Sequence, residues 1–292
     1  MINVAAMTSD RVPHPIPETA YAVFGNPIKH SKSPAIHAAF ADQCGDDITY
    51  RAVRVEIDEF ELKATRFFER GGGGLNITLP FKERAFQLAD ESSDRAKQAG
   101  AANCLIPLPG GKLRADNTDG VGMIRDMVAN HGWQLSGRRA LVLGAGGAAR
   151  GVMHPLLMEN PAEVVIANRT AERAQALAAE FSGHNVSVLG GGFELLEGQT
   201  FDLIINGTSA SLANEMVALP EITLTERCCC YDMMYGAEPT AFMRWAASKT
   251  PWAVSDGLGM LVEQAAESYF LWLGKRPDTR RVIQELRLQL SL

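Results

Sequence analysis

Residues 141–149, LVLGAGGAA, join a short apolar run that is typical of a buried strand to a Gly-rich turn. Glycines at the first and third positions of the turn let the chain reverse sharply and let a pyrophosphate approach the backbone, and Ala149 suits close packing of the following helix. The start of that helix offers unpaired N–H groups to phosphates. We therefore predict that a dinucleotide binds at Gly144, Ala145, Gly146, Gly147 and Ala148.

The residues after the next predicted strand, 163–167, indicate which dinucleotide binds. Sites for NAD commonly place an acidic residue there on the ribose hydroxyls, but this chain has Arg169 and no acid. A guanidinium suits a 2′-phosphate, and Arg173 lies on the same helix face as Arg169, although it could equally be an ordinary solvated helix charge. We predict NADP as the cofactor, held at this strand end by Asn168, Arg169, Thr170 and Arg173.

Short apolar runs alternate with helical patterns along both halves of the chain, which predicts an α/β fold. In the first half we predict strands at 21–25, 50–57 and 74–79, and helices at 34–43 and 58–69. In the second half we predict strands at 139–144, 163–167, 201–206 and 228–232, and helices at 148–159 and 171–181. The second half is therefore predicted to be a doubly wound, Rossmann-type unit. Two glycine clusters, 71–74 and 190–192, are assigned to loops.

The length of 292 residues favours two domains over one large core. A helix predicted at 118–131 connects the halves, because residue 138 begins a fresh strand. The apolar helical pattern at 258–274 could complete either domain, and its periodicity does not choose between them. Residues 1–20 lack an apolar core, so we expect a flexible leader rather than a signal peptide, and Met7 could be the true start.

Composition indicates what kind of partner the protein binds and in which compartment it works. The net charge is -6 and no Lys/Arg-rich run occurs, which argues against nucleic acid or an anionic membrane and favours a small molecule. Five cysteines show no metal-ligand spacing, and the three consecutive ones at 228–230 would alternate between the faces of a strand. We expect core cysteines in a reduced, cytoplasmic protein without a metal site.

Two motifs beside strand ends provide groups for proton transfer. Residues 76–82, NITLPFK, end in Lys82, and residues 116–120, DNTDG, contain Asp119. Each has an ordinary alternative: Lys82, in a segment too irregular for strand or helix, could be solvated, and Asp119 could cap a helix that begins at Gly120. Beside a dinucleotide, the pair suggests hydride chemistry, with Lys82 donating a proton to a ketone and Asp119 orienting the lysine and binding the substrate.

Residues 25–34, GNPIKHSKSP, form a predicted loop between a strand and a helix. Ser33 could simply cap the helix, with Pro34 at its first position. A helix start flanked by two hydroxyls and by lysines is also a good carboxylate site, so both interpretations stay open. His30 is predicted to be a turn residue.

From about residue 21 onward, the chain resembles the shikimate dehydrogenases. The likeness rests on residues 25–34, 76–82, 117–120, 144–149 and 168–170, and on DGLGM at 256–260, which occur in family order. The resemblance implies NADP-dependent interconversion of 3-dehydroshikimate and shikimate in aromatic amino-acid (chorismate) biosynthesis, with Lys82 and Asp119 as the catalytic pair. It also implies substrate binding by Ser31, Ser33, Asn76, Thr78, Asn103, Tyr235 and Gln264, and a nicotinamide site at Thr208, Met233, Gly257 and Met260.

The resemblance further implies that the last helices return to the first domain, so that residues 21–122 and 257–292 form the substrate domain and 123–256 the NADP domain. The chain departs from the family pattern at residues 206–211, which lack a glycine after the Thr-Ser pair, and at Cys104, where Thr is commoner. We expect a monomer or homodimer. A quinate/shikimate dehydrogenase with broader substrate and cofactor use, and a non-catalytic NADP or shikimate sensor, are the alternatives.

Overall fold

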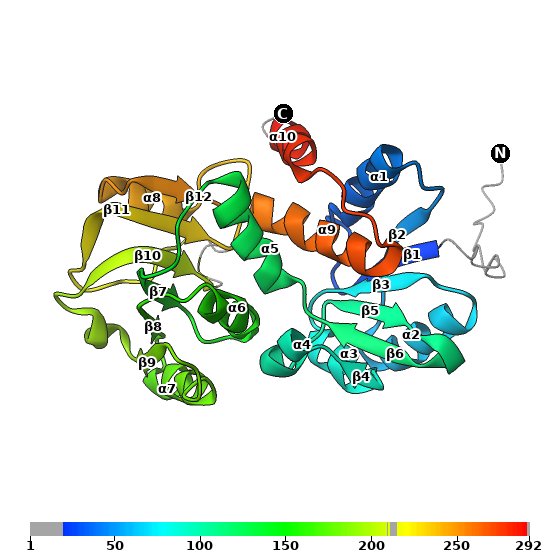
Figure 1. The fold of residues 1–292 in the computed structure, drawn as a ribbon, viewed down its shortest axis with the longest axis horizontal. Coiled ribbons are helices and arrows are strands. Elements are labelled where there is room, and N and C mark those ends of the chain that lie inside the picture. Colours follow the sequence, from blue (N-terminus) through cyan, green and yellow to red (C-terminus); the bar gives the residue numbers. More distant parts are fainter. Residues whose placement is uncertain (1–19, 209, 211–214, 291–292) are drawn as a thin grey trace, which may run out of the picture.

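The computed structural model describes residues 20–208, 210 and 215–290, and places them in two α/β lobes, each built on a six-stranded sheet (Figure 1). The predicted leader, with Met7, lies outside the described residues except for Ala20, which belongs to the first strand instead. The two-domain α/β fold predicted from the sequence is therefore confirmed.

The first sheet is mixed and has the strand order β2-β1-β3-β5-β6-β4. Its strands are β1 (Ala20–Gly25), β2 (Thr49–Arg54), β3 (Gly74–Ile77), β4 (Glu91–Ser92), β5 (Cys104–Pro107) and β6 (Leu113–Asp116). The helices of this lobe are α1 (Ser33–Cys44), α2 (Phe60–Glu69), α3 (Lys82–Leu88) and α4 (Asp94–Ala99). Strands β1, β2 and β3 are parallel, whereas β5 runs antiparallel to β3 and to β6. The loops after β1 and β3 therefore start at the same end of the sheet, where both strands have their carboxyl ends.

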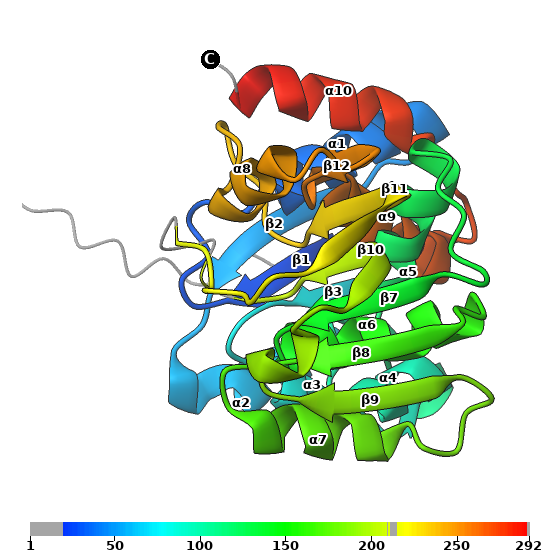
Figure 2. The ribbon, with the colours of Figure 1, turned by 90° about the vertical axis from the view of Figure 1, so that its left-hand side faces the viewer.

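The second sheet is entirely parallel and has the order β12-β11-β10-β7-β8-β9 (Figure 2). Its strands are β7 (Arg139–Leu143), β8 (Glu163–Ala167), β9 (Ser187–Gly191), β10 (Thr200–Asn206), β11 (Thr223–Asp232) and β12 (Ala253–Ser255). Its helices are α6 (Gly147–Met158), α7 (Ala171–Glu180) and α8 (Ala241–Ser248). If β7 is numbered 1 and the sheet is followed from β9 to β12, the strand order is 3-2-1-4-5-6, which is the Rossmann topology. Successive strands are added on one side of β7 up to β9 and on its other side from β10 onward, so the point where the chain changes sides lies between β7 and β10.

Two helices lie between the lobes (Figure 1). The first is α5 (Asp119–Arg125), which continues as a π-helical turn at Asp126–Asn130, and the second is α9 (Leu258–Leu273). A last helix, α10 (Thr279–Leu290), follows. Apolar side chains of α1, α9 and α10 share one buried cluster, so the C-terminal helices pack on the first lobe. The domain boundaries at 122/123 and 256/257 stay predictions.

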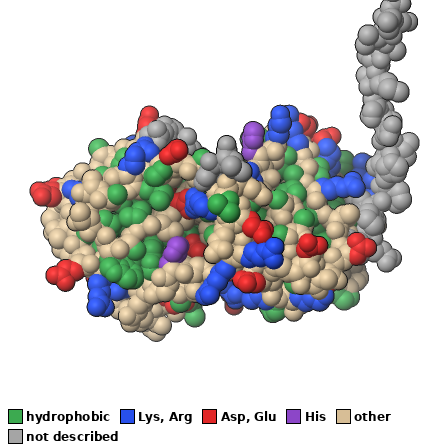
Figure 3. Space-filling view, turned by 90° about the horizontal axis from the view of Figure 1, so that it is seen from above, with side chains coloured by type: hydrophobic (Ala, Val, Ile, Leu, Met, Phe, Trp, Pro, Cys, Tyr) green, Lys and Arg blue, Asp and Glu red, His purple; other side chains and the backbone are tan. Residues whose placement is uncertain are grey.

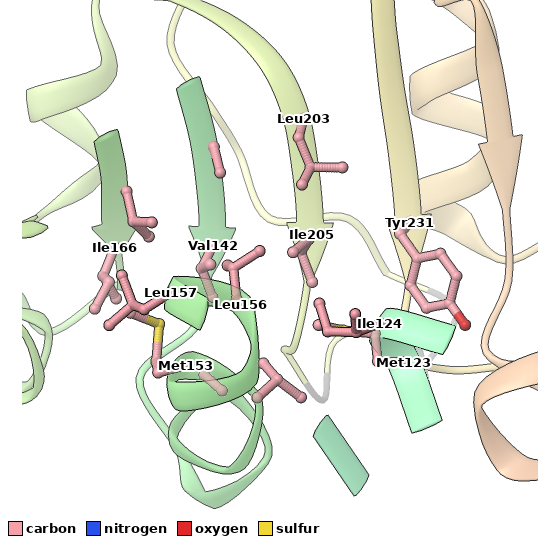
Figure 4. Close-up of a cluster of buried hydrophobic side chains, with 14 of the residues drawn as sticks. Met123, Ile124, Val142, Met153, Leu156, Leu157, Ile166, Leu203, Ile205 and Tyr231 are labelled. Carbon is pink, nitrogen blue, oxygen red and sulfur yellow. The ribbon is translucent and has the colours of Figure 1, made fainter. Parts of the chain in front are cut away.

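Apolar contact between α5, α6 and the second sheet forms the largest core (Figure 4). Met123 and Ile124 of α5 lie beside Ile205, while Leu156 of α6 faces Val142. Because these strands are covered by helices on both faces, they consist of nearly continuous apolar runs, as a parallel sheet requires. The three consecutive cysteines are all buried, with the middle one on the opposite face from its neighbours, as predicted.

The predictions for residues 190–191 and 50–57 are wrong. The glycines at 190 and 191 belong to β9 rather than to a loop, and a Cβ at Gly190 would lie 2.2 Å from the Ala174 carbonyl oxygen, so glycine permits close approach of α7. The strand predicted at 50–57 ends at Arg54, because residues 57–59 form a 3₁₀ turn that leads into α2.

Among the described residues, none of the helices is both long and apolar enough to cross a bilayer. Seen from above, positive and negative side chains are interspersed over both lobes (Figure 3).

Candidate active site

A cavity of about 380 Å³ lies where loops of the two lobes meet α5 and α9. Every residue that the sequence predicted for catalysis or substrate binding lines this cavity: Lys82, Asp119, Ser31, Ser33, Asn76, Thr78, Asn103, Tyr235 and Gln264. Met233, Gly257 and Met260, predicted for the nicotinamide, line it too. Residues as far apart in the chain as Ser31 and Gln264 therefore line one cavity.

Lys82 and Asp119 form an ion pair in this cavity. Lys82 Nζ lies 2.5 Å from Asp119 Oδ2, and the two side chains are 28% and 19% exposed. Lys82 is the first residue of α3, so the prediction of an irregular segment at this position was wrong. Asp119 is the first residue of α5, whose N-cap is Thr118, so the alternative role of Asp119 as the cap of a helix from Gly120 is wrong as well. Both residues therefore begin a helix at the cavity, where each side chain is partly exposed.

A hydrogen-bond network fixes the carboxylate from its other side. The two hydrogens of Asn103 Nδ2 are shared among three acceptors: Asp119 Oδ1 at 2.8 Å, Thr118 Oγ1 at 2.9 Å and Gln264 Oε1 at 3.1 Å. Asn103 Oδ1 accepts from the Thr118 backbone N–H at 2.7 Å. Asp119 thus receives one hydrogen bond on each oxygen, which orients its carboxylate before any ligand binds.

The loop between β1 and α1 supplies the hydroxyls of Ser31 and Ser33. Ser33 is the first residue of α1, the N-cap is Lys32, and no side chain caps the helix, so the interpretation of Ser33 as the cap is wrong. The Ser33 backbone N–H donates to Ser31 Oγ at 3.3 Å. Lys29, His30 and Lys32 line the same cavity, which gives it two further cationic side chains beside the helix start, suited to an anionic group. Residue 30 lies in a turn.

Across the cavity, Tyr235 follows the carboxyl end of β11. Burial, and secondarily the charge of Asp256, raises the pKa of Tyr235, so its hydroxyl keeps its proton and can both donate and accept hydrogen bonds. Asp232 at the end of β11 is fully buried and accepts from Asn206 Nδ2, Thr240 Oγ1 and the Met234 N–H. This carboxylate therefore ties the ends of β10 and β11 together behind the cavity.

The Gly-rich turn fits a pyrophosphate. Gly144 has φ +101°, a backbone conformation that favours glycine. No side chain caps α6, which begins at Gly147, and a Cβ placed at Gly146 or Gly147 would meet no atom within 4 Å. Residues 146–148 are exposed, and the N–H groups in the first turn of α6 have no acceptor within the helix, as phosphate binding at Gly144, Ala145, Gly146, Gly147 and Ala148 requires.

The predicted NADP-selecting residues lie at the start of α7, after β8. Asn168 Nδ2 donates to the Thr170 carbonyl at 2.9 Å, which shapes this turn. Arg169 and Arg173 are exposed, and neither has an ion-pair or hydrogen-bond partner for its guanidinium within the described part of the chain. Two unneutralised guanidinium groups near the Gly-rich turn suit a second phosphate. Thr208 follows β10 and donates through Oγ1 to Asn206 Oδ1 at 2.8 Å.

Several residues of the cavity were not predicted. Val23, Ile28, Ile77 and Leu261 contribute apolar wall, and Tyr50 and Ser268 lie behind it and bond to Asn76. Val23, Ile77 and Leu261 belong to patterns that indicate only a strand or helix core, and Ile28 lies in the predicted loop at 25–34. Tyr50 and Ser268 come from β2 and α9, and nothing in the sequence brings them together.

Comparison with known proteins identifies the family. The profile of the shikimate dehydrogenase substrate binding domain matches residues 23–105, that of shikimate / quinate 5-dehydrogenase matches residues 126–218, and that of the shikimate 5′-dehydrogenase C-terminal domain matches residues 257–287. A shikimate dehydrogenase (NADP(+)) from Cellvibrio japonicus (strain Ueda107) is 53% identical over 270 residues, 92% of this chain and 97% of that protein.

Solved structures agree with the profiles. The crystal structure of an Ael1 enzyme from Pseudomonas putida has a TM-score of 0.85 and 44% identity, over 94% of this chain and 98% of that one. Shikimate 5-dehydrogenase from Thermus thermophilus, in complex with NADP(H) and shikimate, has a TM-score of 0.79 and 32% identity, over 94% and 99%. The chain therefore belongs to the shikimate dehydrogenase family.

Proposed function

We propose that this protein is an NADP-dependent shikimate dehydrogenase, which interconverts 3-dehydroshikimate and shikimate in the cytoplasmic route to chorismate and the aromatic amino acids. One observation carries the proposal: the Lys82–Asp119 pair, 2.5 Å apart, lies in a cavity that is also lined by all the predicted substrate-binding residues and by three of the four predicted nicotinamide-binding residues, Met233, Gly257 and Met260. The relationship to NADP(+)-dependent shikimate dehydrogenases at 53% identity supports it.

In this proposal Lys82 handles the proton. During reduction, its ammonium group donates a proton to the ketone oxygen while the carbonyl carbon receives a hydride, so a C–H and an O–H bond form together. Asp119 keeps Lys82 in place and accepts a hydrogen bond from a substrate hydroxyl. In the oxidative direction the same amine, once deprotonated, accepts the alcohol proton.

The other cavity residues bind and orient the substrate. Ser31 and Ser33 bind its carboxylate at the start of α1, where the helix dipole favours an anion. The remaining contacts to the ring are assigned to Asn76, Thr78, Asn103, Tyr235 and Gln264. Since these side chains come from β3, α1, α9 and four loops, a correctly bound substrate depends on the lobes being correctly joined.

NADP, when bound, supplies or removes the hydride. The open turn at Gly144, Ala145, Gly146, Gly147 and Ala148 is assigned to its pyrophosphate, and Asn168, Arg169, Thr170 and Arg173 to the 2′-phosphate end. Thr208, Met233, Gly257 and Met260 are assigned to the nicotinamide. We propose the domain division given above, 21–122 with 257–292 and 123–256, and a monomer or homodimer that uses neither nucleic acid nor a membrane as partner.

The decisive experiment follows the absorbance of NADPH when the purified protein meets shikimate and NADP. Shikimate with NADP is expected to be the best of the four combinations of shikimate or quinate with NADP or NAD. Greater activity with quinate and NAD would replace the proposal with a quinate dehydrogenase. Binding of both ligands without turnover would indicate a sensor.

A further inference from the structure

The carboxamide of Asn76 lies on the cavity wall, and nearly all of its hydrogen-bonding capacity is already used inside the protein. Its Nδ2 donates to the Asn103 carbonyl oxygen at 3.0 Å and to Ser268 Oγ at 2.9 Å, which engages both amide hydrogens. Its Oδ1 accepts from the Tyr50 hydroxyl at 2.8 Å. An amide has two donor hydrogens and two acceptor lone pairs, so only one lone pair on Oδ1 remains.

The surroundings dictate which way this amide faces. The Asn103 carbonyl, which also accepts the Ile77 N–H at 2.9 Å, can only accept hydrogen bonds. A reversed amide would therefore set two oxygens against each other. The Ser268 hydroxyl donates to the Gln264 carbonyl at 3.1 Å, which leaves its oxygen to accept from Asn76. The oxygen of Asn76 must accordingly be the atom next to Tyr50.

The Tyr50 hydroxyl donates to Asn76 Oδ1 at 2.8 Å. Burial raises the pKa of Tyr50 well above its ordinary value, so the hydroxyl keeps its proton. Its ring stacks on the imidazole of His37 with centroids 4.1 Å apart and planes 6° apart. Neither ring nitrogen of His37 has a partner at full hydrogen-bond geometry within the described residues, but burial lowers the pKa of His37 and the Asn76 side chain lies near enough to raise it in part.

We propose that Asn76 acts toward the substrate only as a hydrogen-bond acceptor, and that Tyr50 and Ser268 are positioning residues that keep its amide in this orientation. The inference rests on the proposed function, in which shikimate binds in this cavity. The group that Asn76 recognises must then carry a donor hydrogen. The reacting oxygen is a carbonyl in one direction of the reaction and cannot donate, so Asn76 selects one of the hydroxyls that do not react.

Shikimate analogues test the polarity of this contact. Each ring hydroxyl is replaced singly by hydrogen, by fluorine, which cannot donate, or by an amino group, which can, and inhibition constants against shikimate are measured. At one non-reacting position, the hydrogen and fluorine analogues are expected to bind equally weakly, ~10-fold worse than the hydroxyl, while the amino analogue stays within ~3-fold. Fluorine tolerated like hydroxyl at every non-reacting position would overturn the proposal.

The Tyr50→Phe variant tests the positioning role, since it keeps the ring stack and removes one oxygen. We expect KM for shikimate to rise ~10-fold with a smaller change in kcat and in NADP affinity. The penalty for fluorine relative to hydroxyl should also shrink, because an amide that Tyr50 no longer holds does not keep its oxygen against the hydroxyl that it recognises. Tyr21→Phe is the matched control, because Tyr21 packs on Trp272 in the same aromatic cluster but does not line the cavity.

A second substitution separates positioning from folding. Ser268→Ala should reproduce the effect of Tyr50→Phe on analogue selectivity, and Ser268→Thr, which keeps the hydroxyl, should restore it. Unchanged KM and unchanged selectivity in Tyr50→Phe would refute the positioning role. Failure of the unmodified enzyme to form NADPH from shikimate would instead refute the proposed function, and that result is read before any variant is made.

Discussion

The substrate side and the cofactor side of this molecule are built in opposite ways. Around Asp119, the polar side chains bond to one another: Lys82, Asn103, Thr118 and Gln264 form a continuous network of hydrogen bonds at 2.5–3.1 Å. Around the Gly-rich turn, by contrast, the helix start is uncapped and the Arg169 and Arg173 guanidinium groups are exposed and lack partners within the described residues.

The difference follows from what each ligand brings. A substrate alcohol is neutral at the reacting carbon, so the protein itself must supply and orient the charges before binding. A dinucleotide phosphate carries its own charge and only needs donors that point at it. We expect changes on the substrate side to alter turnover, and changes on the cofactor side to alter affinity for one cofactor.

The largest effect is expected for Lys82→Ala. Removing the proton donor should lower kcat by ~10³-fold or more while leaving the dissociation constant for NADP nearly unchanged, measured by NADPH formation and by calorimetry. Lys97→Ala, on an exposed face of α4 where Lys97 pairs with Asp94, is the control and should behave like the unmodified enzyme. Normal turnover in Lys82→Ala would remove Lys82 from the mechanism.

The next effect lies on the cofactor side. Replacing Arg169 and Arg173 together by Ala should raise KM for NADP by ~10- to 100-fold and leave KM for NAD unaltered, because only NADP carries the 2′-phosphate. The NADP/NAD ratio of kcat/KM measures this directly. Arg281→Ala, on an exposed turn of α10, controls for a general change of charge. Equal losses with both cofactors would show that the arginines do not recognise the 2′-phosphate.

A third effect concerns the helix junction that supports the substrate side. A Cβ at Gly122 would lie 2.6 Å from the Gln264 backbone nitrogen, so Gly122→Ala should push α5 from α9, lower stability by about 1–3 kcal/mol and raise KM for shikimate. Gly151→Ala in α6 is the matched control, because its Cβ would meet Asn117 only at 3.7 Å. Denaturant unfolding and kinetics of the pair separate packing from helix propensity.

The smallest effect should be visible in acid. Burial lowers the pKa of His37 to about 3, so between about pH 6.5 and 3 the unfolded chain binds a proton that the folded protein does not. The free energy of unfolding should therefore fall as the pH is lowered through this window. His37 alone should lower it by about 1 kcal/mol between about pH 7.5 and pH 5.5. His37→Phe should flatten that part of the curve in denaturant unfolding. An unchanged slope would show that His37 does not contribute.

The sequence predicted the structure best where the residues that a ligand requires also constrain the local backbone. The apolar strand and glycine turn at 141–149 placed β7, α6 and the Rossmann order correctly, because glycine and buried aliphatic runs constrain the backbone locally. Short elements without such a signal, among them β5, β6 and α4, were missed, since four to six residues carry little periodicity.

Sequence alone thus determined the fold class, the family likeness and the chemical character of Lys82, Asp119 and the arginines, because these depend on residue type and local order. Three features were decided only by the tertiary structure. Lys82 begins a helix, Gln264 accepts a hydrogen bond from Asn103, which is 161 positions away in the chain, and the Asn76 side chain is hydrogen-bonded to Tyr50 and Ser268. Hydrogen bonds between distant residues depend on how sheets and helices pack, and no pattern along the chain records them.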